Sequence, residues 1–98
     1  MSFDEGKESV VMRTNPREVE VLAIFDQSGN LRPLRFRIED NMGERKTIKV
    51  DRIILAEVEK LAGNVMIKFR CQSVFGDQAR IFELKYERDT YKWYLFKM

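Results

Sequence analysis

The residue types that most often carry out enzymatic chemistry are scarce in this chain of 98 residues. Histidine is absent, so no imidazole can act as a general base, activate a nucleophile or bind a metal. The single cysteine, Cys71, cannot form a thiolate zinc site on its own. The glycine-rich patterns G-x-x-x-x-G-K and G-x-G-x-x-G, which hold phosphate groups, are also absent. Carboxylates therefore remain as the candidates for acid–base catalysis.

A catalytic pair of carboxyl groups requires pKa values that are shifted by burial or by close neighbours. The candidates here fall in predicted turns or on the outward faces of predicted strands, where a solvated carboxyl group keeps its ordinary pKa. They are Glu39 with Asp40, Asp51, Glu57 with Glu59, and Asp77. We therefore expect solvent-exposed charge rather than enzymatic activity, and neither a cofactor nor a metal.

Cys71 ends a stretch in which apolar and polar side chains alternate. Ile67 and Phe69 share its phase, which predicts that Cys71 is a small buried hydrophobic side chain. A reactive thiol would need an exposed cationic setting, and the neighbouring Arg70 falls on the opposite face of the strand. The inert thiol is the better supported of the two interpretations.

Basic residues outnumber acidic ones on the predicted outward faces, and they support two interpretations. Neighbouring strands commonly pair opposite charges across a solvated face, which requires no ligand. Alternatively, a basic β-surface can follow a phosphate backbone, as in small nucleic-acid-binding barrels. The candidate nucleic-acid-binding residues are Arg35, Arg37, Lys68, Arg70 and Lys85. The net charge of +2 provides no strong long-range attraction for polyanions.

The last nineteen residues, RIFELKYERDTYKWYLFKM, contain six aromatic side chains. Alternation places Phe82, Leu84 and Tyr86 in the core, and Trp93 continues the same inward phase after the turn. The apolar residues left on the outer face are Tyr94, Phe96 and Met98. Either residues near the N-terminus cover them or another protein does, and we take them as candidate protein-interaction residues.

Short strands separated by turn residues are expected to position these side chains. Glycine-containing turns are predicted at 26–30, 40–44 and 62–64, and a loop is predicted at 73–79. The predicted strands cover residues 19–25, 31–39, 45–50, 65–71, 80–87 and 93–98, with a short first strand at 10–12.

Residues 50–61, VDRIILAEVEKL, fit two different periods. As a helix, their apolar residues fill five of six core positions and miss only at Glu57. As a strand, they need a bulge near Ile53 to keep the apolar residues on one face. The preceding β-run enters this stretch without a helix-capping residue. We therefore predict a bent strand, with a helical turn near 56–61 still allowed.

The whole pattern predicts a single all-β domain, because 98 residues suffice for only one core. We expect a small antiparallel barrel of about six strands, SH3-like or similar, over residues 10–98. Residues 1–9 are polar and acidic and predict a flexible leader. The start has no secretory signal pattern, and the longest apolar run, VLAIF, is too short to span a bilayer. We expect a cytoplasmic protein that does not contact a membrane.

Between residues 31 and 98 the chain has a P-x-x-F strand, a valine-rich strand and a final F-E-L-x-Y…W-x-L hairpin. The matching positions are Pro33, Phe36, Val50, Phe82, Glu83, Leu84, Tyr86, Trp93 and Leu95. This outline resembles a family of small, functionally uncharacterised bacterial all-β domains. Such domains occur near lesion-bypass (Y-family) DNA polymerases, so the resemblance implies an accessory role in DNA damage tolerance. It indicates no catalytic residue, because the matching positions are mainly packing residues.

These observations together predict a non-catalytic binding or accessory module. The leading hypothesis is a contact with another protein, or self-association, through an edge strand and the surface aromatics of the last strand. The alternative is a weak nucleic-acid-binding barrel with an accessory role in DNA damage tolerance.

Overall fold

The computed structural model describes residues 16–97. The predicted leader 1–9, the predicted strand 10–12 and Met98 lie outside the described residues. Seven strands are present: β1 (Arg17–Phe25), β2 (Leu31–Glu39), β3 (Arg45–Lys49), β4 (Arg52–Leu61), β5 (Asn64–Phe75), β6 (Gln78–Glu87) and β7 (Lys92–Phe96). Within the described range the chain contains no helix, and hence none long and apolar enough to cross a membrane.

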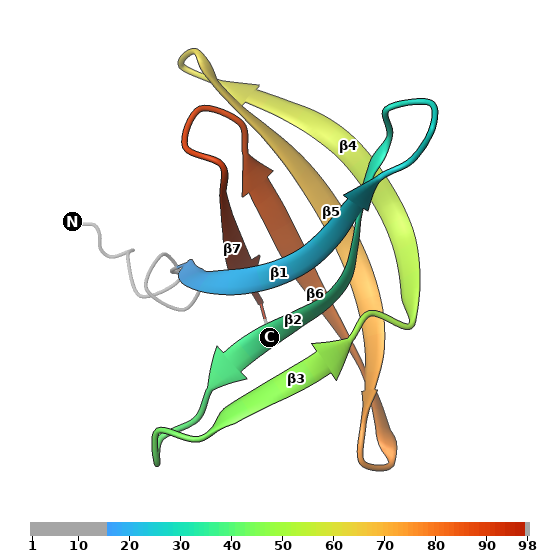
Figure 1. The fold of residues 1–98 in the computed structure, drawn as a ribbon, viewed down its shortest axis with the longest axis vertical. Helices are drawn as coiled ribbons and strands as arrows, with labels where there is room; N and C mark the ends of the chain where they lie inside the picture. Colours follow the sequence, from blue (N-terminus) through green and yellow to red (C-terminus); the bar gives the residue numbers. More distant parts are fainter. Residues whose placement is uncertain (1–15, 98) are drawn as a thin grey trace, which may run out of the picture.

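All seven strands belong to one antiparallel sheet with the order β3-β2-β1-β7-β6-β5-β4. β3 and β4 follow each other in the chain but form the two edges of the sheet, so the sheet curls into a half-barrel (Figure 1). The connection between them bridges the two edges. The N–H of Val50 donates to the carbonyl of Leu34 on β2 at 2.9 Å, and that of Asp51 to the carbonyl of Gln72 on β5 at 3.0 Å.

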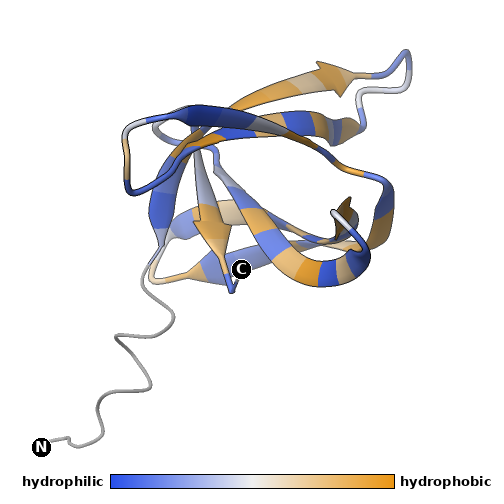
Figure 2. Ribbon diagram, turned by 90° about the horizontal axis from the view of Figure 1, so that it is seen from below, coloured by the Kyte–Doolittle hydropathy of each residue, from blue (hydrophilic) through white to orange (hydrophobic). Residues whose placement is uncertain are grey.

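The all-β class is confirmed, whereas the strand count differs from the expected number of about six. The predicted β-run 45–61 divides at Val50 and Asp51, because the chain passes there from one edge of the sheet to the other. Figure 2 shows hydrophobic and hydrophilic residues following one another in bands along the strands.

The loop predicted at 73–79 is wrong. β5 continues to Phe75 and β6 begins at Gln78, so that only Gly76 and Asp77 remain as the turn. Gly76 has a φ of 60°, which a two-residue hairpin turn requires at its first position and which glycine adopts without strain. The two strands are therefore longer than their alternation alone had indicated.

For residues 50–61, the strand interpretation is confirmed. The register between β4 and β5 shifts between Ile53 and Leu55, where a bulge had been predicted. From Leu55 to Leu61 the pairing with β5 is continuous, and no helical turn occurs. The misleading helical period arises because both faces of β4 carry apolar residues, such as Leu55 on the outer face and Val58 on the inner face.

The core lies on the concave face of the curled sheet. Its buried members are Phe36, Ile48, Phe69, Cys71, Phe82, Leu84, Trp93 and Leu95, which confirms the predicted inward phases. The rings of Phe36 and Phe82 lie 5.2 Å apart, and those of Phe69 and Trp93 lie 5.8 Å apart. Aromatic pairs at these separations connect β2 to β6 and β5 to β7 across the interior.

Two of the predicted turns share one construction. In each, an aspartate side chain accepts two backbone N–H bonds at 2.9 Å: Asp26 from Ser28 and Asn30, and Asp40 from Met42 and Glu44. The bond from the Asn30 N–H is the main reason why the pKa of Asp26 lies below its ordinary value. The pattern D-x-x-G-x thus fixes the hairpins that place β1, β2 and β3 side by side.

Candidate functional site

The five predicted nucleic-acid-binding residues do not form one patch. Arg35 and Arg37 lie on β2, whereas Lys68 and Arg70 lie on β5 and Lys85 on β6. In the sheet, β1 and β7 separate β2 from β6. The structure therefore presents two basic groups, and their surroundings differ.

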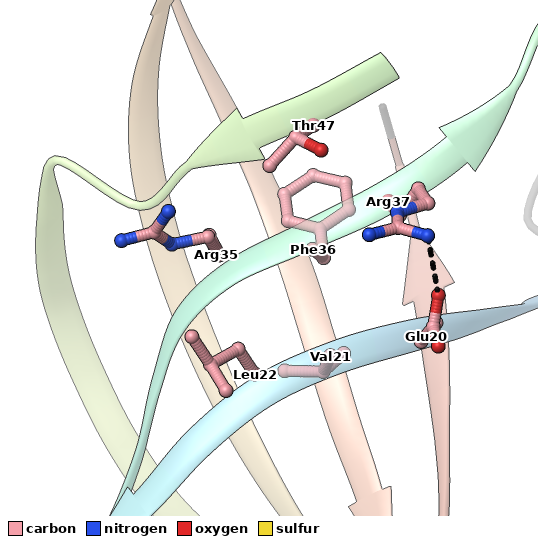
Figure 3. A pocket seen from close by; sticks show the side chains of 7 residues that line it. All are labelled: Glu20, Val21, Leu22, Arg35, Phe36, Arg37 and Thr47. Carbon is pink, nitrogen blue, oxygen red and sulfur yellow. Dashed lines mark ion pairs between the residues drawn. The ribbon is translucent and has the colours of Figure 1, made fainter. Parts of the chain in front are cut away.

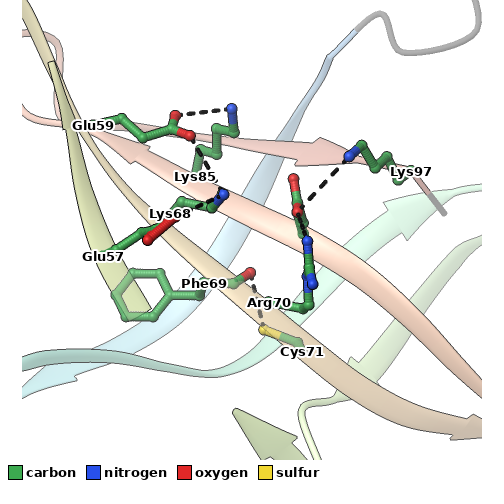
Figure 4. A network of polar contacts seen from close by, with 9 residues as sticks. Glu57, Glu59, Lys68, Phe69, Arg70, Cys71, Lys85 and Lys97 are labelled. Carbon is green, nitrogen blue, oxygen red and sulfur yellow. Dashed lines mark hydrogen bonds and ion pairs between the residues drawn. The ribbon is translucent and has the colours of Figure 1, made fainter. Parts of the chain in front are cut away.

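The group on β5 and β6 is held in ion pairs. The Lys68 ammonium lies 2.9 Å from Glu57 and 3.6 Å from Glu59, and the Lys85 ammonium lies 3.0 Å from Glu59 (Figure 4). The bond to Glu57 raises the pKa of Lys68, and the bond from Lys85 lowers the pKa of Glu59. These four side chains neutralise one another, so they leave little charge for a phosphate backbone.

Glu83 extends this set of contacts on the outer face of the sheet. Its carboxylate lies 3.3 Å from the guanidinium of Arg70 and 3.9 Å from the ammonium of Lys97 (Figure 4). Alternation places Glu83 on the outer face, between the inward-facing Phe82 and Leu84, but the residue is only 5% exposed. Its carboxylate is paired with the long side chains of Arg70 and Lys97, and alternation alone does not reveal these contacts.

The predicted protein-interaction residues Tyr94 and Phe96 lie on the outer face of β7, and both are half-buried. The ammonium of Lys85 sits 4.5 Å from the centroid of the Phe96 ring. The hydroxyl of Tyr94 donates to Glu87 at 3.5 Å. β7 itself lies inside the sheet, between β1 and β6, so the last strand is not an edge strand.

Arg35 and Arg37 have a different environment. They lie on either side of Phe36 along β2 and line a pocket of about 350 Å³ together with Leu22 of β1 and Thr47 of β3 (Figure 3). The remaining lining residues are Glu20, Val21 and Phe36. Arg37 lies 3.4 Å from the Glu20 carboxylate, whereas Arg35 has no ion pair with any residue in the described range. Of the five predicted nucleic-acid-binding residues, the two that line this pocket, Arg35 and Arg37, are therefore less neutralised by carboxylates than the group on β5 and β6.

The long edge strand β4 is a second candidate surface, and the sequence had not identified it as an edge. Among residues 16–97 it pairs only with β5. Four of its large apolar side chains are exposed, and Val58 and Leu61 show the largest fractions, 61% and 80%. They are Ile54, Leu55, Val58 and Leu61. The feature of the sequence that indicates this surface is the excess of apolar residues on both faces of the stretch, and the same excess produces its helical period.

Four of the candidate carboxylates have structural roles in the described part of the chain. Asp40 holds a turn, Glu57 and Glu59 bind lysines, and a carboxylate oxygen of Asp51 accepts the N–H of Val74 at 2.8 Å. In residues 16–97 no three histidine, cysteine, aspartate or glutamate side chains gather closely enough to hold a metal ion.

Cys71 is fully buried, as its phase predicted. Burial raises the pKa of its thiol to about 12. At neutral pH the reactive thiolate is therefore essentially absent.

Comparison of this chain with protein-family models, with curated proteins and with solved structures finds no match.

Proposed function

We propose that this protein is a non-catalytic binding module that pairs the free edge of β4 with an extended segment of a protein chain. The segment comes from another protein or from a second copy of this chain. The observation that carries the proposal is a strand of ten residues that, within the described part of the chain, is paired on one side only and exposes four large aliphatic side chains. An unpaired row of backbone N–H and C=O groups is a template for strand addition.

The other edge of the sheet supports this choice by contrast. β3 has only five residues, and the side chains of Arg45, Lys46 and Lys49 are exposed on it. Short length and charged side chains are the usual protection of an edge strand against pairing. β4 is twice as long, and beyond its bulge near Ile53 two of its charged side chains, Glu57 and Glu59, are bound to lysines of β5 and β6. The binding stretch that we propose is therefore Leu55–Leu61.

The side chains of this stretch define the chemistry of the partner strand. Leu55, Glu57 and Glu59 lie on the outer face, and Ala56 and Val58 lie on the inner face. Directly opposed residues of paired strands interact most strongly. A matching segment carries apolar residues on the inner face and includes lysine or arginine opposite the glutamates.

A peptide with the sequence of residues 64–70, NVMIKFR, is a defined probe for this surface. The same sequence already pairs with β4 on its other side, where Lys68 faces Glu57 and Ile67 faces Val58. We expect this peptide to bind the full chain by isothermal titration calorimetry. The double variant V58K/L61K places two charges on the free edge, and it should bind at least about tenfold more weakly, a loss of about 1.4 kcal/mol.

The control is the double variant V74K/I81K. Val74 and Ile81 are 58% and 50% exposed, similar to Val58, but they lie on β5 and β6, beyond the residues that pair with β4 and β7. This variant should bind the peptide as the unmodified chain does. Absence of binding to the unmodified chain, or equal losses in both double variants, would contradict strand addition at β4.

The type of barrel, the location in the cell and the cellular role of the proposed module are inferred from the sequence. The curled sheet is consistent with an SH3-like barrel, and the lone reduced thiol with a cytoplasmic location. The resemblance to domains found near lesion-bypass polymerases implies that the partner belongs to DNA damage tolerance. We include these three points in the proposal.

A further inference from the structure

Two pairs of like charges lie directly across neighbouring strands in this protein. Lys68 of β5 faces Lys85 of β6, and Arg35 of β2 faces Lys49 of β3. Both pairs are on the outer surface, because the residues next to them in sequence, such as Phe69 and Phe36, are buried. Like charges in directly opposed positions repel each other and destabilise a sheet. A nearby negative charge would relieve this repulsion at each pair.

For the Lys68–Lys85 pair, side chains of the same chain supply the negative charges. Glu57 and Glu59 contact the two ammonium groups at 2.9 to 3.6 Å. Two positive and two negative charges form a closed network on this side of the sheet.

The Arg35–Lys49 pair has no such partner among residues 16–97. Neither side chain forms an ion pair in that range, and both are exposed. The nearest carboxylate on the same face of β1, Glu20, is bound to Arg37 instead (Figure 3). Arg35 also lines the pocket of about 350 Å³. An anion bound there would neutralise Arg35 and Lys49, as Glu57 and Glu59 neutralise Lys68 and Lys85.

We propose that the outer face of β2 and β3 binds the phosphate groups of a single nucleic acid strand, with Arg35 and Lys49 as the central contacts. Besides this pair the same face carries further basic residues and the hydroxyl of Thr47, a hydrogen-bond donor beside the pocket. The basic residues of this face are Arg32, Arg35, Arg37, Arg45 and Lys49, against Glu39 as the one acidic residue on these two strands.

Two features favour a phosphate backbone over an acidic peptide. Arginine forms bidentate bonds to phosphate, and four of the five basic residues on this face are arginines. Arg35 and Arg37 lie two residues apart on one strand, about 7 Å along its axis, so they follow a line, as a linear polyanion does. The pocket contains no exposed aromatic ring, since Phe36 is buried. We therefore expect contacts to phosphate rather than to bases, and no preference for sequence.

The test uses fluorescence anisotropy with a labelled oligothymidylate and the full chain. We expect binding at about 50 mM salt that weakens steeply towards 200 mM, because bound phosphates release counterions. The variant R35Q/K49Q should bind at least about tenfold more weakly at the lower salt concentration. Its slope of log affinity against log salt should be smaller by about 1.4, the value for two lost contacts to a single strand.

The matched control is R52Q/R88Q, which removes the same net charge from exposed positions outside β2, β3 and the stretch Leu55–Leu61. It should retain the affinity of the unmodified chain. R35Q/K49Q removes a repulsive pair, so its free energy of unfolding should be no lower than that of the unmodified chain. Measuring this free energy by urea unfolding therefore separates a loss of binding from a loss of folding.

Three results would overturn the proposal: no binding at low salt, equal losses in the two glutamine variants, or competition by polyglutamate as effective as that by inorganic polyphosphate. The last result would assign the face to an acidic protein. The proposal does not depend on β4, so V58K/L61K should bind the oligothymidylate as the unmodified chain does. Failure of peptide binding at β4 and failure of nucleic acid binding at β2 and β3 are thus separate outcomes.

Discussion

At the scale of single residues, Cys71 shows how burial determines chemistry. The sequence predicted a buried, inert thiol from its phase with Phe69, and the structure confirms the burial. Its Sγ atom donates a bond of 3.5 Å to the carbonyl of Phe69. A thiol in this position contributes packing rather than reactivity.

The raised pKa of Cys71 gives a pH-dependent prediction. Burial favours the neutral thiol in the folded protein, so its contribution to stability is complete below the ordinary pKa of 9.0 and is lost as the pH rises towards about 12. The free energy of unfolding should fall in this window by up to about 1.4 kcal/mol per pH unit. Urea unfolding at several pH values measures this fall.

The control for this prediction is C71A, in which the thiol is absent. Lysines such as Lys68, whose pKa is also raised, lose their contribution in the same alkaline range, and C71A retains them. We expect a smaller fall with pH in C71A than in the unmodified chain. An identical fall in both proteins would show that the thiol does not contribute.

Polar residues were predicted less well than the apolar core. Alternation identified the side of the sheet on which Glu83 lies, but not that Arg70 and Lys97 cover it. Alternation likewise places Arg35 and Lys68 on outer faces, but it does not predict that only Lys68 is bound by carboxylates of the described residues. Their difference depends on which strands are neighbours, and one sequence does not contain that information.

At the scale of the elements, the β4–β5 hairpin contains a local strain. Its turn consists of Ala62 and Gly63, with φ values of 51° and 83°. A two-residue turn with two positive φ values is well suited to Asn-Gly, whereas alanine in this conformation is strained. The tight turn predicted at 62–64 is confirmed, and its first residue is not the best one for that geometry.

Replacement of this alanine by asparagine should therefore stabilise the protein. We expect A62N to raise the free energy of unfolding by about 1 kcal/mol, measured by urea unfolding. The comparison is A79N, since Ala79 lies within β6 and has no positive φ. There asparagine should be neutral or destabilising, because it is disfavoured in strands. Equal effects of the two substitutions would contradict strain at Ala62.

The elements that the sequence predicted best are those bounded by turn residues on both sides. The strand 31–39 coincides with β2, and glycine-containing turns flank it. The least accurate prediction was the loop at 73–79, where Ser73, Val74 and Phe75 continue β5. One glycine and one aspartate suffice for that turn, so the polar residues around it gave a false impression of a longer loop.

At the scale of the whole molecule, the corner at Val50 and Asp51 determines which surfaces are free. It sends the chain from one edge of the sheet to the other and leaves β4 with a free edge. Ser73 and Asp51 reinforce this corner: the Ser73 hydroxyl donates to the carbonyl of Lys49 at 2.6 Å, and the Asp51 carboxylate accepts the N–H of Val74. The sequence predicted the all-β class, but not the strand order that makes β4 an edge.

Strand order could not be predicted because pairing partners are chosen by contacts far apart in the chain. The last strand, whose surface aromatics were expected to contact another protein, lies between β1 and β6. Its outer side chains Tyr94 and Phe96 are engaged by Glu87 and Lys85. The proposed protein contact consequently belongs to β4.

The most direct test of this account is backbone hydrogen exchange in the stretch Leu55–Leu61, with and without the peptide NVMIKFR. Amide groups on the free edge exchange readily when unpaired and are protected when a strand is added. We predict that the peptide slows exchange in Leu55–Leu61 and leaves β3 unchanged. Exchange in Leu55–Leu61 that is the same with and without bound peptide would contradict strand addition at β4.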